Sequence, residues 1–283
     1  MKLPDFPLKP VNKAPEPETE SEKNQPEPKT AEGNKYLADA HLAKGRVHQA
    51  ITRYKKAAHM DNSPTHRTDL GDAYAYAELP LKAVQQYRRA IKSNSKCPEP
   101  HFSLAEVYVR YGKWQAAESE YASAVELAPD NHFYRYKLAC AHVKTSRLDE
   151  AIAQLEEAVS LRPKDSFYRF ELARLCVEVG RCAEAVSEME EAVALNPEDD
   201  YYTARLGMLY ARIGRLEKAA EMYREAIRLS PRKLAYWCLL GDVYYLQGLG
   251  SRAEQQYLEA AEIDDYESDF VLRARRFMLG GSW

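Results

Sequence analysis

The sequence predicts an all-α protein, a solenoid of about seven stacked helix-turn-helix repeats. The main observation is a period of 34 residues, which appears when the segments 132–165, 166–199 and 200–233 are aligned. A repeat of this length cannot bury its apolar face alone and must stack on its neighbours. Prolines recur with the same period, at Pro129, Pro163, Pro197 and Pro231. The pattern therefore favours an extended binding surface.

The repeats account for nearly all of the chain after its first thirty residues. Extending the frame in both directions from the three clearest segments gives seven repeats, followed by a last helix from residue 268. The predicted boundaries are 1–30 for a leading tail, 31–63, 64–97, 98–131, 132–165, 166–199, 200–233 and 234–267 for the repeats, and 268–283 for a capping helix and the C-terminus.

Each repeat is expected to contain two helices. In the repeat 132–165, the first helix has Tyr136, Ala139 and Val143 on one face, at the spacing of an amphipathic helix. The second has Ile152 and Leu155 on its apolar stripe and cannot continue past the proline that follows it. Glycines suited to a helix end separate the two helices, at Gly112, Gly180, Gly214 and Gly248, with Ser146 in the fourth repeat.

Small and large side chains alternate where the helices must pack. Alanine or glycine recurs in the first helix, as Gly71, Ala105, Ala139, Ala173, Gly207 and Gly241. A large residue recurs in the second helix, as Tyr54, Tyr87, Tyr121, Leu155, Met189, Tyr223 and Tyr257, each three residues before an alanine. This alternation is how a close-packed core avoids voids, so these residues are interpreted as structural.

The combined pattern resembles the tetratricopeptide repeat family. The residues that carry the resemblance in the last repeat are Trp237, Leu240, Gly241, Tyr244, Gly248, Ala253, Tyr257 and Ala260. The resemblance covers residues 31 to 267 and implies a right-handed solenoid whose first helices line a concave groove. It also implies that the second, fifth, sixth, ninth, twelfth and thirteenth positions of each repeat face that groove.

At these positions the sequence places aromatic rings among cations. The predicted peptide-binding residues are Phe102, Arg110, Phe133, Tyr136, Lys137, Lys144, Phe167, Phe170, Arg174, Tyr201, Arg205 and Arg212. Such a groove suits a peptide with apolar anchors and acidic flanks. We expect Phe133, Phe167 and Tyr201 to be the anchors, although some of these rings could instead pack between repeats. The predicted function is a non-catalytic scaffold or adaptor for a protein or peptide partner.

An alternative function rests on the uneven charge of the chain. The net charge is −2 over residues 1–33, +7 over residues 34–97 and −8 over residues 98–283. The basic repeats carry Arg53, Lys55, Lys56, Arg88, Arg89 and Lys92. They could bind an acidic protein, nucleic acid or a membrane surface in a multi-partner assembly or a chaperone-like factor. Nucleic acid is the less favoured ligand, because aromatic residues are not interleaved with these cations.

The ends of the chain are expected to differ from the repeats. Residues 1–30 are rich in proline, glutamate and lysine and are predicted to be disordered, as a tether, a binding motif or an inert leader. From Ser268, Phe270, Val271, Ala274 and Phe277 form the apolar stripe of the predicted capping helix, which could also bind a partner.

Composition excludes several classes of function. No motif for a phosphate loop, a nucleophile or a metal site is present, so we expect no enzyme activity, no cofactor and no metal. No apolar run is long enough to span a membrane. The five cysteines are scattered and odd in number, which suits a reducing compartment, and we expect a cytoplasmic protein of unknown oligomeric state.

Overall fold

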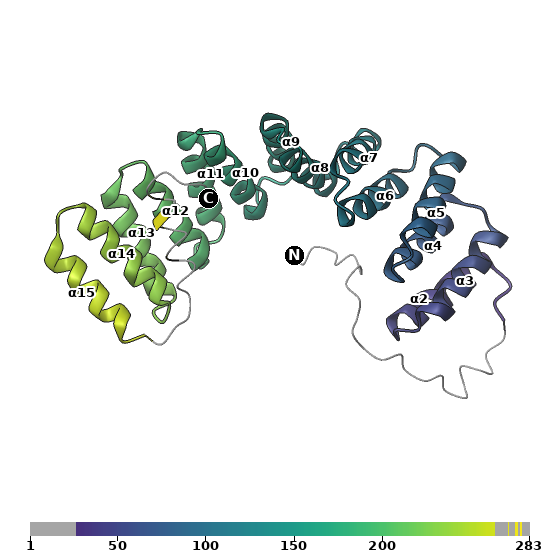
Figure 1. Cartoon of the computed structure of the whole chain (residues 1–283), viewed down its shortest axis with the longest axis horizontal. Helices are drawn as coiled ribbons and strands as arrows, with labels where there is room; N and C mark the ends of the chain where they lie inside the picture. The colour runs from purple at the N-terminus through teal and green to yellow at the C-terminus, as the bar shows by residue number, and fades with distance from the viewer. Residues whose placement is uncertain (1–26, 264–270, 272–274, 277, 279–283) are drawn as a thin grey trace. The chain divides into compact units, whose positions relative to one another are not determined.

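The structure is a computed structural model that describes residues 27–263, 271, 275–276 and 278. Across these residues all regular secondary structure is helical, and the helices pair in chain order (Figure 1). The first helices of the pairs are α2 (Ala31–Ala43), α4 (Pro64–Tyr76), α6 (Pro98–Arg110), α8 (His132–Lys144), α10 (Ser166–Glu178), α12 (Asp200–Arg212) and α14 (Leu234–Leu246). The second helices are α3 (Val47–Met60), α5 (Pro80–Ser93), α7 (Trp114–Leu127), α9 (Leu148–Leu161), α11 (Cys182–Leu195), α13 (Leu216–Leu229) and α15 (Gly250–Ala261). The predicted all-α repeat fold is confirmed.

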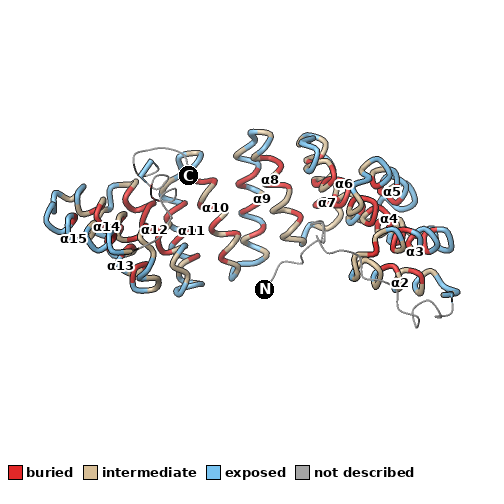
Figure 2. The backbone as a smooth tube through the Cα atoms, turned by 60° about the horizontal axis from the view of Figure 1, so that its bottom comes forward, coloured by how far each residue is buried: buried red, intermediate tan, exposed pale blue. Residues whose placement is uncertain are grey.

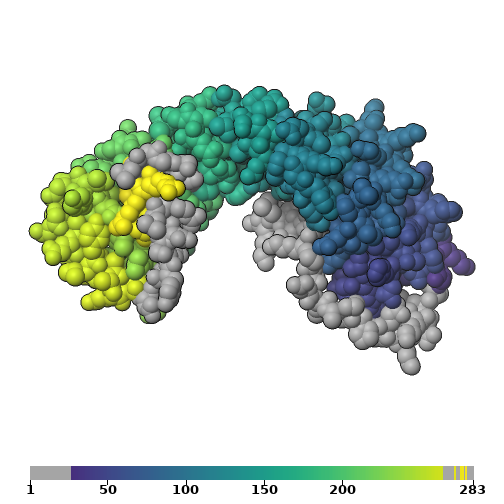
Figure 3. Space-filling view, in the orientation of Figure 1, coloured from purple at the N-terminus to yellow at the C-terminus, as the bar shows by residue number. Residues whose placement is uncertain are grey.

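The chain divides into two compact units. The N-terminal unit ends at Thr145 and contains α2 to α8, and the C-terminal unit begins at Ser146 and contains α9 to α15. Within each unit, neighbouring helices form a continuous outer surface (Figure 3). Each unit is therefore described by itself.

Five of the seven described first helices begin at a side-chain cap, and α6 and α14 do not. The side chain of Asn131 accepts hydrogen bonds from the backbone N–H groups of Phe133 and Tyr134, both at 3.1 Å. Caps of the same kind start four other first helices, at Thr30, Ser63, Asp165 and Asp199. These caps satisfy N–H groups that have no partner within the helix, so they fix where these five helices start.

A left-handed residue ends each first helix and turns the chain into the second. Gly112, with φ of 67°, is such a residue, and Lys113 N–H then donates to the carbonyl of Tyr108 at 2.9 Å. This is the bond of a Schellman motif, which favours glycine. Two turns use other residues, since Glu78 has φ of 57° and Ser146 has φ of 61°. Both departures carry local backbone strain.

The core lies between the helices of each pair and between adjacent pairs. Buried residues follow the facing sides of the helices, while the outer sides are exposed (Figure 2). Tyr87, Tyr121 and Tyr223 are at most 1% exposed. Gly71 is needed because a Cβ atom there would lie 2.4 Å from the ring of Tyr87. The predicted alternation of small and large residues thus matches the packing.

The predicted ends of the chain lie mainly outside the described residues. Of the leading tail, only residues 27–30 are described, and there Glu27 pairs with Arg53 at 2.8 Å. Of the predicted capping helix, Val271, Arg275, Arg276 and Met278 are described as helical, and Val271 is 5% exposed. The remaining residues, 1–26 and the other positions after 263, are not described.

Candidate functional site

The predicted groove residues fall in two groups, one in each compact unit. Those of the N-terminal unit are on α6 and α8, and those of the C-terminal unit are on α10 and α12. The first group is Phe102, Arg110, Phe133, Tyr136, Lys137 and Lys144, and the second is Phe167, Phe170, Arg174, Tyr201, Arg205 and Arg212.

In the N-terminal unit, three rings from two adjacent first helices form an aromatic cluster. Phe102 of α6 stacks on Tyr134 of α8, with ring centres 4.7 Å apart and an angle of 21°. Phe133 packs on Phe102 at 5.6 Å. Phe102 is only 2% exposed, whereas Phe133 is half-buried. The buried ring therefore supports the half-exposed one, and we call these three residues the N-terminal triad.

The C-terminal unit repeats this arrangement at the equivalent positions of its own repeats. Phe170 of α10 stacks on Tyr202 of α12 at 5.1 Å and 15°, and Tyr201 packs on Phe170 at 5.9 Å. Phe170 is 8% exposed and Tyr201 is 37% exposed. We call Phe170, Tyr201 and Tyr202 the C-terminal triad, in which Tyr201 offers a ring to solvent on a rigid base.

The triads divide the predicted aromatic residues by role. Phe102 and Phe170 were expected to face a ligand, but both are buried. They pack instead against the more exposed rings of Phe133 and Tyr201. Phe133, Tyr136 and Phe167 are half-buried, and none of the three expected anchors is fully covered. Phe102 and Phe170 are at the fifth position of their repeats, where rings of the following repeat cover them, whereas Phe133 and Tyr201 are at the second position and stay partly open. Tyr136 is also at a fifth position but is only half-buried.

Most of the predicted cations are engaged within the chain. Lys137 pairs with Glu106 at 3.0 Å, and Arg174 pairs with Glu171 and Glu178, both at 2.9 Å. Arg205 lies over the ring of Tyr201 at 4.9 Å.

The other cations of the N-terminal unit also have partners there. Lys144 lies 5.8 Å from the ring centre of Trp114, and Arg110 donates to the carbonyl of Ala75 at 3.2 Å. The groove positions are therefore less basic than the sequence indicates. Arg212 is half-buried on α12.

A second set of polar contacts was missed by the sequence analysis. The large tyrosine of several second helices donates its hydroxyl to a carboxylate 15 residues earlier, at the ninth position of the first helix. Tyr87 donates to Asp72 at 2.6 Å and Tyr257 to Asp242 at 2.7 Å. The same bond joins Tyr54 to Asp39 and Tyr121 to Glu106. The fixed spacing of tyrosine and acid was the signal that could have found them.

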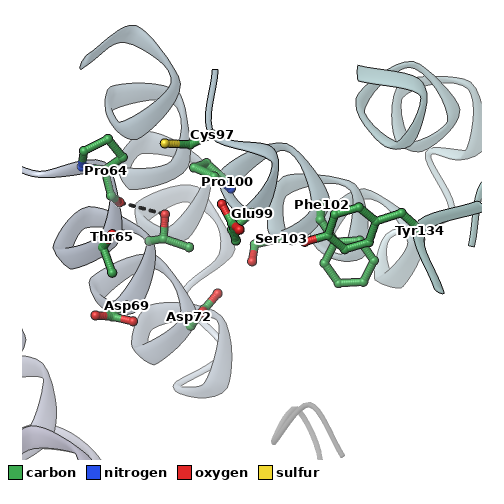
Figure 4. A pocket seen from close by; sticks show the side chains of 11 residues that line it. Pro64, Thr65, Asp69, Asp72, Cys97, Glu99, Pro100, Phe102, Ser103 and Tyr134 are labelled. Atoms are coloured by element: carbon green, nitrogen blue, oxygen red, sulfur yellow. Dashed lines mark hydrogen bonds between the residues drawn. The ribbon is translucent and has the colours of Figure 1, made fainter. Parts of the chain in front are cut away.

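The N-terminal unit also contains a cavity of about 370 Å³ between α4 and α6 (Figure 4). Its lining is Pro64, Thr65, Thr68, Asp69, Asp72, Cys97, Glu99, Pro100, Phe102, Ser103 and Tyr134. Figure 4 shows Asp69 and Asp72 on one side, and the stacked rings of Phe102 and Tyr134 at the other end.

The two aspartates of this cavity are perturbed by burial. Burial raises the pKa of Asp72 to about 6, although hydrogen bonds from Tyr87 and Ser103 lower it. Burial also raises the pKa of Asp69, against the effect of its partner Lys35. The described residues that line the cavity include three carboxylates and no lysine, arginine or histidine. This pocket is thus acidic, in contrast to the predicted aromatic and basic groove.

Comparison with known proteins identifies the family. Residues 38–271 match the sequence model of the cilia and flagella-associated protein 70 C-terminal domain. The chain belongs to this family. The match covers most of the chain and both compact units, so the triads and the cavity all lie inside the family domain.

Solved structures with the same repeat fold are similar over large parts of the chain. A tetratricopeptide repeat protein from Parabacteroides merdae covers 88% of this chain and 99% of its own, with 16% identity and a TM-score of 0.55. PilF of Pseudomonas aeruginosa covers 73% and 94%, with 18% identity and a TM-score of 0.56. YrrB, described as a TPR protein with an unusual peptide-binding site, covers 68% and 99%, with 20% identity and a TM-score of 0.55. These likenesses show the tetratricopeptide repeat fold alone.

One curated relative shares a short segment. A serine/threonine-protein phosphatase T of Trypanosoma brucei brucei is 30% identical over 97 residues, which is 34% of this chain. The matched segment spans about a fifth of the phosphatase, 21% of its length.

The second helices at the start of the family domain carry a separate basic surface. In α3 and α5 every charged residue is a cation, namely Arg53, Lys55, Lys56, Lys82, Arg88, Arg89 and Lys92. Some of these cations have partners within the chain. Glu27 forms ion pairs with Arg53 and Lys56. Arg88 donates a hydrogen bond to the hydroxyl of Tyr108 at 3.1 Å. The predicted basic repeats are thus basic on their second helices, while Asp39, Asp69 and Asp72 lie on the first helices.

Two negative findings concern the described residues. No cluster of histidine, cysteine, aspartate or glutamate among them could hold a metal ion. None of the described helices is long and apolar enough to cross a membrane.

Proposed function

We propose that the chain is a protein-interaction module whose first helices bind partner segments, with Phe133 as the aromatic anchor of the N-terminal unit and Tyr201 as that of the C-terminal unit. Helical repeat proteins in general use their extended surfaces for binding. The observation that carries the proposal is the pair of triads. Each one packs a partly exposed ring against a buried phenylalanine that is itself stacked on a tyrosine, and a ring held in this way binds a partner with little loss of entropy.

The ligand proposed from this geometry is a peptide or protein segment with apolar side chains near the anchors. Acidic flanks remain part of the proposal around Tyr201, where Arg205 lies over the ring and donates to its hydroxyl at 2.6 Å. Near Phe133 they are less favoured, because Lys137 is already neutralised by Glu106. We also propose that the protein is located in the cytoplasm, as expected from its cysteines. The family description suggests a location in cilia or flagella, which we propose as well.

A second candidate function is the binding of an acidic partner by α3 and α5. The observation that favours it is that these two helices carry seven cations and no acid. Lys55, Lys82 and Lys92 are exposed there, and so is Leu81 at 85%. An electrostatic surface of this kind would bind with strong dependence on salt.

The test is a selection of peptides from a random phage-displayed library on the full chain, followed by affinity measurements on the selected peptides. Phe133→Ala and Tyr201→Ala should each weaken binding by about tenfold or more, which is the effect of removing an aromatic anchor. Leu258→Ala is the matched control, because Leu258 is exposed on the second helix α15 and lies outside both triads and outside the basic surface of α3 and α5.

The outcomes separate the two functions. If both anchor variants bind the selected peptides as tightly as the wild type, the triads are not the binding site. If instead Leu81→Ala and a charge reversal at Lys55 weaken binding, and the anchor variants do not, the basic surface of α3 and α5 is the site.

A further inference from the structure

We infer that the cavity between α4 and α6 is a pocket for the arginine side chain of a partner peptide, with Asp72 as its carboxylate. This inference rests on the proposed function in one respect, namely that the ligand is a protein segment. It adds an acidic subsite, lined by three carboxylates, to the basic groove that the sequence predicts.

The cavity exists because one repeat interface lacks an aromatic triad. At the following interface the fifth, second and third positions are Phe102, Phe133 and Tyr134, whose rings fill the space. At the interface between α4 and α6, the same three positions are Thr68, Glu99 and Pro100, all smaller than the ring systems. The space that the rings would occupy is left as a cavity of about 370 Å³. That volume is near the lower end for ligand pockets, about 300–1,000 Å³, and suits one long side chain.

The chain itself shows what the carboxylate at this repeat position binds. Asp242 is the equivalent of Asp72 in the last repeat, and it accepts the same tyrosine hydrogen bond. Arg275 holds Asp242 through two hydrogen bonds, from Nε at 2.6 Å and from Nη2 at 2.9 Å. Bidentate contact of this kind is the preferred geometry between guanidinium and carboxylate.

Glu106 provides a second internal precedent. It accepts a hydrogen bond from Tyr121, and Lys137, which is 31 residues later, approaches it at 3.0 Å. The residue 31 positions after Asp72 is Ser103, whose short side chain hydrogen-bonds to Asp72 and brings no charge. The chain therefore supplies a cation to Glu106 from the following first helix and to Asp242 from Arg275. At the equivalent place beside Asp72 it has the hydroxyl of Ser103, and Lys35 acts on Asp72 through Coulombic attraction.

The remaining lining favours a guanidinium group over other ligands. Asp69 and Glu99 add negative charge to the same cavity, although Asp69 is partly neutralised by Lys35. An anion would be repelled, and a neutral apolar group would leave Asp72 half-buried with only the Coulombic attraction of Lys35 to offset its charge. The stacked rings of Phe102 and Tyr134 at the far end give a planar cation an aromatic surface (Figure 4).

The experiment is a titration of the full chain with three small probes, followed through the methyl resonances of Thr65 and Thr68. The probes are the N-acetyl methylamides of arginine, citrulline and lysine, of which citrulline has a similar shape to arginine without its charge. The arginine probe should shift both methyl signals and bind with a Kd on the order of millimolar, which suits one isolated side chain. The citrulline probe should not bind, and the lysine probe should bind several-fold more weakly.

Two variants and a control test the site itself. Asp72→Asn keeps an acceptor for Tyr87 but removes the charge, and Thr68→Phe introduces the ring that the next repeat has at Phe102. Each should weaken binding of the arginine probe by at least tenfold. Glu106→Gln, at the equivalent position of the next repeat and outside the cavity, should leave it unchanged.

The inference is overturned if the citrulline or lysine probe binds as tightly as the arginine probe, if Thr68→Phe binds normally, or if no probe shifts the two methyl signals. Failure of the proposed function is measured separately. Phe133→Ala and Tyr201→Ala should keep binding of the arginine probe, since neither residue lines the cavity. Peptides selected on the wild type should be enriched in arginine, and those selected on Thr68→Phe should not.

Discussion

Tyr223 is the one member of the tyrosine series whose hydroxyl finds no hydrogen-bond partner among the described residues. Its ring is fully buried, and the residue 15 positions earlier is Met208, where four other repeats have an acid. A buried hydroxyl without a partner costs free energy of folding. The tyrosine ring therefore recurs in Tyr223 at the same repeat position, but the hydrogen bond from its hydroxyl to a carboxylate does not.

Replacing this tyrosine by phenylalanine should have opposite effects in two repeats. Tyr223→Phe should leave the free energy of unfolding unchanged or raise it by about 1 kcal/mol, because an unpaired polar group is removed. Tyr87→Phe should lower it by about 1–3 kcal/mol, since Asp72 loses a charged hydrogen bond. Urea unfolding of both variants measures the difference, and equal effects would contradict the role of the tyrosine–acid pairs.

Asp72 should also make stability depend on pH. Burial raises its pKa from 3.8 to about 6, so the folded state holds a proton that the unfolded state releases between about pH 4 and 6. Stability should therefore fall as the pH rises through this window. Asp72→Asn lacks this titration, while Asp69, Lys35 and His66 remain in both proteins. The urea midpoint of the wild type should drop relative to the variant from pH 4 to 6, and parallel curves would contradict this account.

At the scale of the helix pair, the distance between the two helices decides which glycines are required. A Cβ atom at Gly71 would lie 2.4 Å from the ring of Tyr87, and Tyr87 is buried and cannot move aside. At Gly207 the nearest atoms would be at 3.2 Å and 3.3 Å, on Met222 and Tyr223. Both glycines are in the same repeat position, so sequence alone treats them as equivalent.

Alanine substitution should separate these two positions. Gly71→Ala should lower the free energy of unfolding by about 1–3 kcal/mol through overpacking. Gly207→Ala should be close to neutral, because a tight contact is offset by the gain in helix propensity of up to about 1 kcal/mol. Thermal or urea unfolding measures both. A neutral Gly71→Ala would show that α4 and α5 can move apart at little cost.

Most of the helical elements could be predicted from the sequence, whereas the site could be predicted only in part. The helix pairs follow from local periodicity and from caps and turns, which involve neighbouring residues. The different exposure of Phe102 and Phe133 depends on which rings of the next repeat cover them. The neutralisation of Lys137 by Glu106 depends on a contact 31 residues apart. Such contacts cannot be read from one repeat.

For the whole molecule, each repeat should be coupled only to its neighbours. Stability in a solenoid is close to a sum of repeat and interface contributions. The overpacked Gly71→Ala should therefore speed amide hydrogen exchange in α4, α5 and the adjacent helices. Exchange in α12 to α15 of the C-terminal unit should be unchanged. A uniform loss of protection along the chain would mean that it unfolds as a single cooperative body.

The separation of charge is also a property of the whole N-terminal unit. Residues 34–97 have a net charge of +7, yet their cations gather on α3 and α5 and the cavity on the first helices is acidic. One segment thus offers two faces of opposite sign. The sequence predicts the positive net charge of residues 34–97, but it does not predict the acidic cavity.

The central claim is that partners bind along the first helices. The most direct measurement is hydrogen exchange of the full chain with and without the tightest peptide from the library selection. The account predicts slower exchange in α6, α8, α10 or α12, around Phe133 or Tyr201, and in α4 if the peptide contains arginine. Protection confined to α3 and α5, with no change in the first helices, would contradict it.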